Sequence, residues 1–220
     1  MLLSMNVIEL FSSIDGEGKR QGFLTTFLRL HDCNIRCSYC DTLYSYGPES
    51  TFESMSVQAV ADVIEQLENH RITVTGGEPL LQEPAIIELI DELTRRNARY
   101  DFNIETNGTI IPSFHRDNVW FTYDYKTPSS LAEEAMNLDI FKVATPADII
   151  KFVVGSMQDL DRMDEILKTY PTDAQIFVSP VWGNIEGATI VEYMKAHDWQ
   201  NVRFQLQIHK FIWDPDAKGV

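Results

Sequence analysis

Apolar and polar positions follow two periods along the chain, and these periods predict strands and helices in turn. The runs VIELF at 7–11 and LTTFLRL at 24–30 have the branched and aromatic content of strands. ITVTGG at 72–77 predicts a third strand, which ends in a glycine turn. Later β-rich runs predict five more strands, at residues 101–108, 119–126, 148–155, 175–181 and 202–208.

Helical periodicity separates several of these strands. Ser56 is suited to cap a helix over residues 56–70. The apolar face of this helix would consist of Val57, Val60, Ala61, Ile64 and Leu67. Residues 83–97 predict a second amphipathic helix, which has basic residues in its last turn. Two further helices are expected at 157–170 and 187–198.

This alternation of strands and helices predicts parallel βαβ units and therefore an α/β fold. A closed eight-fold barrel usually takes about 250 residues, whereas this chain has 220. We therefore expect a partial, open βα barrel of parallel strands with flanking helices, and a doubly wound sheet is the alternative. No linker separates a second domain, so residues 1–220 are expected to form one domain. In either fold, ligands should bind at the carboxyl ends of the strands.

Charge and hydropathy narrow the class of partner. The chain has 18 Lys and Arg against 33 Asp and Glu, a net charge of -15, which repels a phosphate backbone. No apolar run approaches the roughly 20 residues that span a bilayer, and the first residues lack the features of a signal peptide. We expect a cytoplasmic protein that acts on a small molecule and binds neither nucleic acid nor membrane.

All three cysteines lie in one short segment, HDCNIRCSYCDTLYS at 31–45, as Cys33, Cys37 and Cys40. Their odd number argues against disulfides. A zinc site with His31 as fourth ligand remains open, as does a set of inert thiols. An iron–sulfur cluster normally has four thiolate ligands. Three thiolates would leave one iron free for a substrate or cofactor, by the same logic that leaves an open position on a catalytic zinc.

Two polar segments follow predicted strands. In TGGEP at 75–79, the paired glycines allow backbone to approach a ligand, and Glu78 can accept a hydrogen bond from an ammonium group. In ETNGT at 105–109, Glu105 and Asn107 are candidates to contact a ribose or substrate. Both segments could instead be simple turns: a strand–helix turn after which Pro79 starts the next element, and an Asn-Gly turn.

These motifs resemble those of a known superfamily. CNIRCSYC resembles the cluster motif of the radical S-adenosylmethionine (SAM) enzymes, and TGGEP resembles their SAM-binding GGE motif. The resemblance implies an open barrel of the radical SAM type, a [4Fe-4S] cluster and bound SAM. A closer resemblance, to the 7-carboxy-7-deazaguanine synthase family, covers nearly the whole chain in order and spacing. It rests on FSSIDGEGKRQG, FLRLHDCNIRCSYCDTLY, TGGEPLLQ, ETNGT, DYKTPSS, VSPVWG and QLQIHKFI.

The closer resemblance implies a reaction and its partners. The family contracts the ring of 6-carboxy-5,6,7,8-tetrahydropterin to give 7-carboxy-7-deazaguanine and ammonia. A radical derived from SAM removes hydrogen from C6 and later returns it, and Mg2+ assists. The resemblance also implies a flavodoxin or ferredoxin as electron donor, a homodimer, and a role in queuosine biosynthesis.

The resemblance also implies site residues. Cluster and magnesium ligands are implied at Cys33, Cys37, Cys40 and Thr42. Contacts with SAM are implied at Tyr39, Cys40, Asp41, Gly77, Glu78, Glu105, Asp124, Tyr125, Lys126, Ser179, Pro180, Val181 and Trp182. Contacts with the pterin are implied at Ile14, Asp15, Gly16, Arg29 and Thr75.

Two of these residues suit their roles by chemistry. The Arg29 guanidinium is suited to bidentate capture of a carboxylate, although a surface ion pair is the alternative. The Thr42 hydroxyl is a hard oxygen ligand of the kind magnesium accepts, although a turn residue is the alternative.

The chain departs from the family pattern at two places. Asp15 stands where the family has Gln, and a carboxylate lacks the donors of an amide. Some family members end near the position of Pro215 and use the terminal carboxylate in the site, but here DAKGV follows.

Other functions remain possible at this stage. A glycyl-radical-enzyme activase would share the cysteine spacing but would not need Arg29 or Thr42. A non-enzymatic iron–sulfur carrier would normally need a fourth cysteine. A zinc-stabilised binding module is the third alternative.

Overall fold

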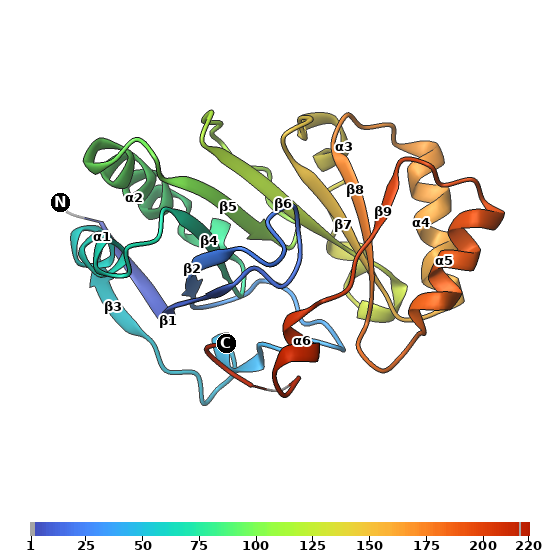
Figure 1. Ribbon diagram of the computed structural model, residues 1–220, viewed down its shortest axis with the longest axis horizontal. Helices are drawn as coiled ribbons and strands as arrows, with labels where there is room; N and C mark the ends of the chain where they lie inside the picture. The colour runs from blue at the N-terminus through green and yellow to red at the C-terminus, as the bar shows by residue number, and fades with distance from the viewer. Residues whose placement is uncertain (1–2, 216) are drawn as a thin grey trace.

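The computed structural model, which describes residues 3–215 and 217–220, is built on one nine-stranded sheet (Figure 1). Its strands, in spatial order, are β3 (Glu53–Ser56), β1 (Ser4–Ile14), β2 (Leu24–Leu30), β4 (Arg71–Gly76), β5 (Asp101–Thr106), β6 (Val119–Lys126), β7 (Ile149–Val154), β8 (Gln175–Pro180) and β9 (Val202–Phe204). β1 pairs antiparallel with β2 and β3, and every pair from β2 to β9 is parallel. The edge strands β3 and β9 do not pair with each other, so the predicted open barrel is confirmed.

Helices cover the outside of this sheet (Figure 1). They are α1 (Val57–Gln66), α2 (Glu83–Arg96), α3 (Ile140–Val143), α4 (Met157–Thr169) and α5 (Gly187–Ala196). A further short helix, α6 (His209–Ile212), lies instead at the open end of the barrel, near the C-terminus (Figure 1). Short 3-10 turns lie at Leu43–Ser45, Pro79–Gln82, Pro128–Ser130 and Glu133–Ala135. Among the described residues, no helix has the length and apolar character needed to cross a membrane.

The four helices expected from periodicity are present, with one shorter than predicted. Ser56 caps α1 by accepting a hydrogen bond from the Ala59 amide at 3.2 Å. The helix ends at Gln66 rather than near residue 70, because Glu68 adopts a left-handed φ of 53°. The segment predicted as a strand over 202–208 is extended only from Val202 to Phe204, and its remainder leads into α6. β3, α3 and α6 were not predicted.

The two faces of each strand have different roles, and β6 shows the separation most clearly. Phe121, Tyr123 and Tyr125 are buried in the hydrophobic core beneath the helices. Asp124 and Lys126, on the other face, line the cavity inside the barrel. Because successive side chains of a strand point to opposite faces, every second residue of β6 can face the cavity while its neighbours pack in the core.

Candidate active site

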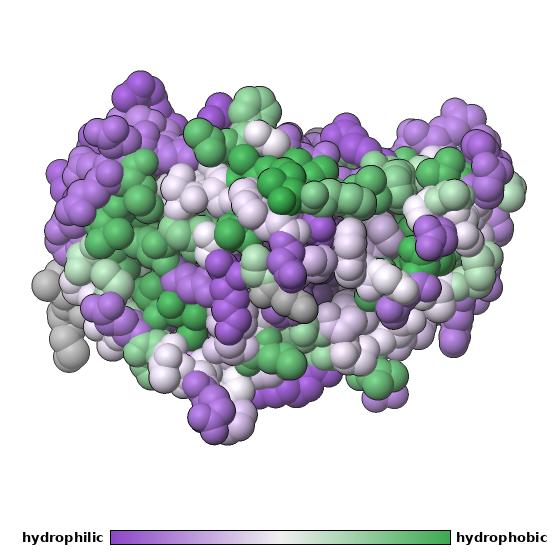
Figure 2. Space-filling model, turned by 60° about the horizontal axis from the view of Figure 1, so that its bottom comes forward, coloured by the Kyte–Doolittle hydropathy of each residue, from purple (hydrophilic) through white to green (hydrophobic). Residues whose placement is uncertain are grey.

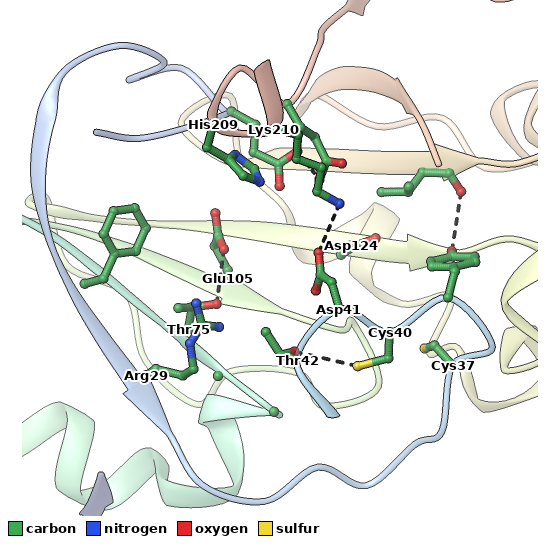
Figure 3. Close-up of a pocket in the computed structure, with 18 of the residues that line it drawn as sticks. Arg29, Cys37, Cys40, Asp41, Thr42, Thr75, Glu105, Asp124, His209 and Lys210 are labelled. Carbon is green, nitrogen blue, oxygen red and sulfur yellow. Dashed lines mark hydrogen bonds and ion pairs between the residues drawn. The ribbon is translucent and has the colours of Figure 1, made fainter. Parts of the chain in front are cut away.

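A cavity of about 280 Å³ occupies the interior of the barrel, where the cysteine loop and the C-terminal segment also contribute to its wall (Figure 3). Figure 2 turns the lower end of the molecule in Figure 1 toward the viewer, and both hydrophilic and hydrophobic areas are exposed on this face. Most of the predicted site residues line the cavity, namely Ile14, Asp15, Gly16, Arg29, Cys33, Cys37, Tyr39, Cys40, Asp41, Thr42, Thr75, Gly77, Glu105, Asp124, Lys126, Val181 and Trp182. The fold thus brings together segments that are far apart in the sequence.

The glycines of TGGEP fix the start of the cysteine loop. The Gly77 amide donates to the Leu30 carbonyl at 3.2 Å, and the Glu78 amide donates to the Asp32 carbonyl at 2.8 Å. A Cβ atom at Gly77 would lie 1.9 Å from the Asp32 oxygen and 2.9 Å from the Cys33 Cβ. Gly77 is therefore required by the approach of two protein backbones, in addition to its place beside the cavity.

The three thiols are free and line one cavity. The Asn107 amide nitrogen lies 3.8 Å from the Cys33 sulfur, a contact of the kind that tunes cluster sulfurs. Burial raises the pKa of Cys37 to about 11, whereas coordination to a metal holds a thiol in its thiolate form. The three thiols and the hydrogen-bonding group beside them therefore fit a [4Fe-4S] cluster held by Cys33, Cys37 and Cys40.

A single zinc ion fits these residues less well. Within residues 3–215 and 217–220, no three His, Cys, Asp or Glu side chains are arranged to hold one metal ion. The His31 ring packs against Phe52, with the ring centroids 4.3 Å apart, and does not line the cavity. A zinc site with His31 as fourth ligand is therefore not supported.

Four charged residues of the cavity wall, Glu17, Asp124, Lys126 and Lys151, form a chain of ion pairs. Lys126 lies 3.0 Å from Asp124, and Lys151 lies 3.5 Å from Asp124 and 2.7 Å from Glu17. Burial favours the neutral form of Asp124, but Lys126 and Lys151 outweigh it and hold the pKa of this carboxyl below its ordinary value. The second Asp124 oxygen, Oδ1, is buried and has no hydrogen-bond partner among the described residues. An orphaned acceptor of this kind fits a hydroxyl or amine of a bound ligand.

Sequence reasoning missed Lys151 and Glu17 in this series. Lys151 interrupts an otherwise apolar run, IIKFVV at 149–154, in a strand that is buried throughout. A lone lysine in such a strand is a signal that the opposite face of the sheet is polar.

Arg29 forms another part of the cavity wall, beside Thr75 and Glu105 (Figure 3). The Thr75 hydroxyl donates to Glu105 Oε2 at 3.2 Å. Burial raises the pKa of Glu105 to about 7, so its carboxyl can exchange a proton near neutral pH. Phe11 and Phe27, stacked with centroids 5.3 Å apart, add a flat apolar surface to the lining.

Asp15 lines the cavity, but its carboxylate is bound by other protein side chains. That carboxylate accepts hydrogen bonds from Arg20 Nε and Thr25 Oγ1, both at 2.9 Å, and from Thr73 Oγ1 at 3.1 Å. Asp15, which stands where the family has Gln, therefore forms a buried ion pair with Arg20.

Four predicted SAM contacts lie outside the cavity lining: Glu78, Tyr125, Ser179 and Pro180. Both Glu78 carboxylate oxygens accept hydrogen bonds from the protein, at Leu80, Thr106 and Asn107. The Tyr125 hydroxyl donates to Glu133 on the helix side of the sheet. Ser179 differs, because its hydroxyl is buried without a partner in the described chain and its residue pairs with the cavity residue Val153.

The C-terminal segment closes one side of the cavity, which the strand pattern did not predict. Lys210 of α6 lies 3.3 Å from Asp41 (Figure 3), and the Phe211 ring packs edge-on against Trp182 with centroids 5.0 Å apart. Pro215 and the described residues after it also line the cavity. The chain therefore continues along the site beyond the position at which some family members end.

Fold, cysteine loop and cavity together define a radical SAM protein, and residues 29–170 match the family model described as the Radical SAM superfamily. A 7-carboxy-7-deazaguanine synthase from Clostridium acetobutylicum is 37% identical, over 99% of this chain and 100% of the relative. Another from Leptospira interrogans is 36% identical, over 99% of each chain. The chain belongs to the 7-carboxy-7-deazaguanine synthase family.

A solved structure supports the fold. QueE from Escherichia coli superposes with a TM-score of 0.70 at 22% identity, covering 92% of this chain and 93% of that one. Family membership also decides against the electron-carrier and zinc-module alternatives.

Proposed function

We propose that this chain is a 7-carboxy-7-deazaguanine synthase, which converts 6-carboxy-5,6,7,8-tetrahydropterin to 7-carboxy-7-deazaguanine with release of ammonia. The observation that carries the proposal is the shared cavity of a family member: three free thiols and an arginine line the same enclosed space. When bound, the cluster and SAM supply the radical that removes hydrogen from C6 of the pterin.

The residues of the chain divide this work between them. Cys33, Cys37 and Cys40 hold the cluster. The guanidinium of Arg29 binds the pterin carboxylate, because it lines the cavity and its Nε has no hydrogen-bond partner among the described residues.

Other groups complete the binding of the ligands. The stacked Phe11 and Phe27 rings offer a flat surface beside Arg29 to the heterocycle. Glu105 can hold or release a proton at a carboxylate oxygen within the same space. Asp124 offers its free oxygen to SAM, in line with the family resemblance.

Several finer features complete the proposal, and each is supported by the family resemblance. Thr42, whose side chain lines the cavity, supplies an oxygen to Mg2+. A flavodoxin or ferredoxin reduces the cluster, and the enzyme acts as a homodimer. The whole chain works as one domain in the cytoplasm, where thiols are kept reduced, and its product enters queuosine biosynthesis.

Anaerobic turnover tests the function. The reconstituted protein is incubated with SAM, a chemical reductant and the carboxypterin, and the products are analysed by mass spectrometry with an ammonia assay. We expect 7-carboxy-7-deazaguanine and ammonia in equal amounts from the parent and neither from Cys37→Ala. A parent that cleaves SAM but returns the carboxypterin unchanged would exclude this function.

A further inference from the structure

Glu9 is a charged residue of β1. It lies outside the cavity lining, beside Arg29 on the neighbouring strand β2. The two residues are cross-strand partners in the register of β1 and β2. Glu9 Oε2 lies 3.6 Å from Arg29 Nε, and the side chains of Glu9 and Arg29 are only 20% and 15% exposed. Neither of these two atoms has a hydrogen-bond partner among the described residues.

A β-bulge brings Glu9 to this position. Val7 pairs with Leu30 and Glu9 pairs with Arg29, so Ile8 is one extra residue in β1. An extra residue exchanges the two faces of a strand. Val7 is buried in the core on the helix side, whereas Phe11, two residues beyond Glu9, lines the cavity. Without the bulge, the Glu9 side chain would lie on the same face as Val7, in the hydrophobic core.

The position of Glu9 decides which part of Arg29 is available. Glu9 attracts the Nε side of the guanidinium, and Arg29 itself lines the cavity. The Tyr44 ring, whose centroid lies 5.8 Å from Arg29 Cζ, lines the cavity, and its hydroxyl interacts with Glu9, so that Tyr44 adjoins both members of the pair. A guanidinium held in this way presents its two terminal NH2 groups as a fixed fork.

We propose that Glu9 is a positioning residue, which holds Arg29 so that its terminal nitrogens face the carboxylate of the pterin. This inference rests on the proposed function, because it takes a carboxylated pterin as the ligand of Arg29. Glu9 does not touch the substrate. It limits the arrangements that Arg29 can adopt in the free enzyme and so lowers the entropy lost on binding.

The test compares two ligands that differ only in the carboxylate. Dissociation constants are measured for 6-carboxytetrahydropterin and for tetrahydropterin, with the cluster-loaded, SAM-bound protein and no reductant, so that no turnover occurs. The dissociation constant for tetrahydropterin divided by that for 6-carboxytetrahydropterin reports recognition of the carboxylate alone. Glu9→Gln is expected to lower this ratio roughly two- to ten-fold, the range expected when one side chain must be immobilised on binding instead of beforehand. Glu9→Asp, which keeps the charge, should retain more of it, and Arg29→Ala should abolish it.

Glu92→Gln is the matched control. Glu92 is an ion-paired glutamate of α2 with a side chain 14% exposed, and it binds Arg96 outside the cavity. Its loss should leave the ratio unchanged. SAM affinity should be the same in all variants, which shows that the cluster end of the cavity is intact.

Three results would overturn the inference: an unchanged ratio in Glu9→Gln, an equal loss of affinity for both pterins, or a higher ratio. The last of these would show that Glu9 competes with the substrate for Arg29. A parent that makes the product while Glu9→Gln keeps the parental ratio contradicts the inference alone. A parent that discriminates between the pterins but makes no product contradicts the proposed function and leaves the role of Glu9 standing.

Discussion

Thr42 follows the last cysteine of the loop by two positions, and the loop determines where its hydroxyl lies. That hydroxyl is 3.6 Å from the Cys40 sulfur, and the residue lines the cavity (Figure 3). Magnesium keeps several waters and takes few protein oxygens. One hydroxyl, together with substrate oxygens and waters, is therefore a reasonable shell for the proposed ion.

Thr42→Ala should keep the cluster and SAM binding but lose the stimulation of product formation by magnesium. Thr42→Ser should keep most of the stimulation, because the hydroxyl remains. The measurement is the rate of product formation against added magnesium for both variants. Equal stimulation of the Ala variant and the parent would place the ion elsewhere.

Glu105 gives a prediction about pH. Burial raises its pKa to about 7 from the ordinary 4.5, against the opposing charge of Lys151. Folding therefore favours the protonated form, and this contribution to stability is complete below about pH 4.5 and is lost as the pH rises through about 7. The thermal midpoint of Glu105→Gln should rise relative to that of the parent between pH 5 and pH 8.

The control for Glu105→Gln is Glu53→Gln, which removes an exposed carboxylate from the edge strand β3. Thermal midpoints of all three proteins are measured anaerobically across this range. A constant difference between Glu105→Gln and the parent would show that Glu105 does not titrate there.

At the scale of elements, the site depends on loops that fasten one another. The loop after β4 holds the start of the cysteine loop through two backbone hydrogen bonds. The Glu78 carboxylate accepts from the Thr106 hydroxyl at 2.8 Å and the Asn107 amide at 2.7 Å, which ties the loop after β4 to the loop after β5. Asn107 in turn donates to Asn34, between two of the cysteines, at 2.8 Å. Displacement of one loop should therefore reach the cluster ligands.

Gly77→Ala tests this dependence. Its Cβ would lie 1.9 Å from the Asp32 carbonyl oxygen, a backbone atom that cannot move without the cysteine loop. We expect a large loss of iron per chain after reconstitution. Gly155→Ala is the matched control, because its new Cβ would meet neighbours only at an ordinary 3.4 Å. Parental iron content in Gly77→Ala would show that the loop accommodates the methyl group.

For the molecule as a whole, Arg20 links strands around the base of the open barrel. Its guanidinium donates to Asp15 just after β1 at 2.9 Å, to Ile72 and Thr73 of β4 at 2.9 and 2.7 Å, and to Asp101 of β5 at 3.2 Å. The residue is 7% exposed. One side chain thus fixes the relative positions of three parts of the sheet.

Arg20→Met should destabilise the protein by about 3–5 kcal/mol, because it leaves the Asp15 carboxylate buried without its partner. The double variant Arg20→Met with Asp15→Asn should recover part of that loss. Urea unfolding of the parent and both variants measures the difference. If the double variant were no more stable than the single one, the uncompensated charge would not be the cause.

The sequence by itself determined most of the longer strands and helices and the chemistry of the cluster loop. The strands at 24–30 and 119–126 have the predicted bounds, since period-two and β-branched patterns are local properties of the chain. Three cysteines in eight positions need no tertiary information to be brought together. The same period places Tyr125 on the helix side of β6, between the cavity residues Asp124 and Lys126, so alternation alone argues against a SAM contact by its side chain.

The tertiary structure alone decided how distant segments meet. The bulge at Ile8 turns Glu9 toward Arg29, because register depends on the pairing of two strands and not on either strand alone. The carboxylates of Glu78 and Asp15 are bound by protein donors, and α6 crosses to Asp41, because these contacts join residues far apart in the chain. Local patterns specify which face of an element is apolar, whereas strand pairing in the sheet and the paths of the loops specify which polar groups line the cavity.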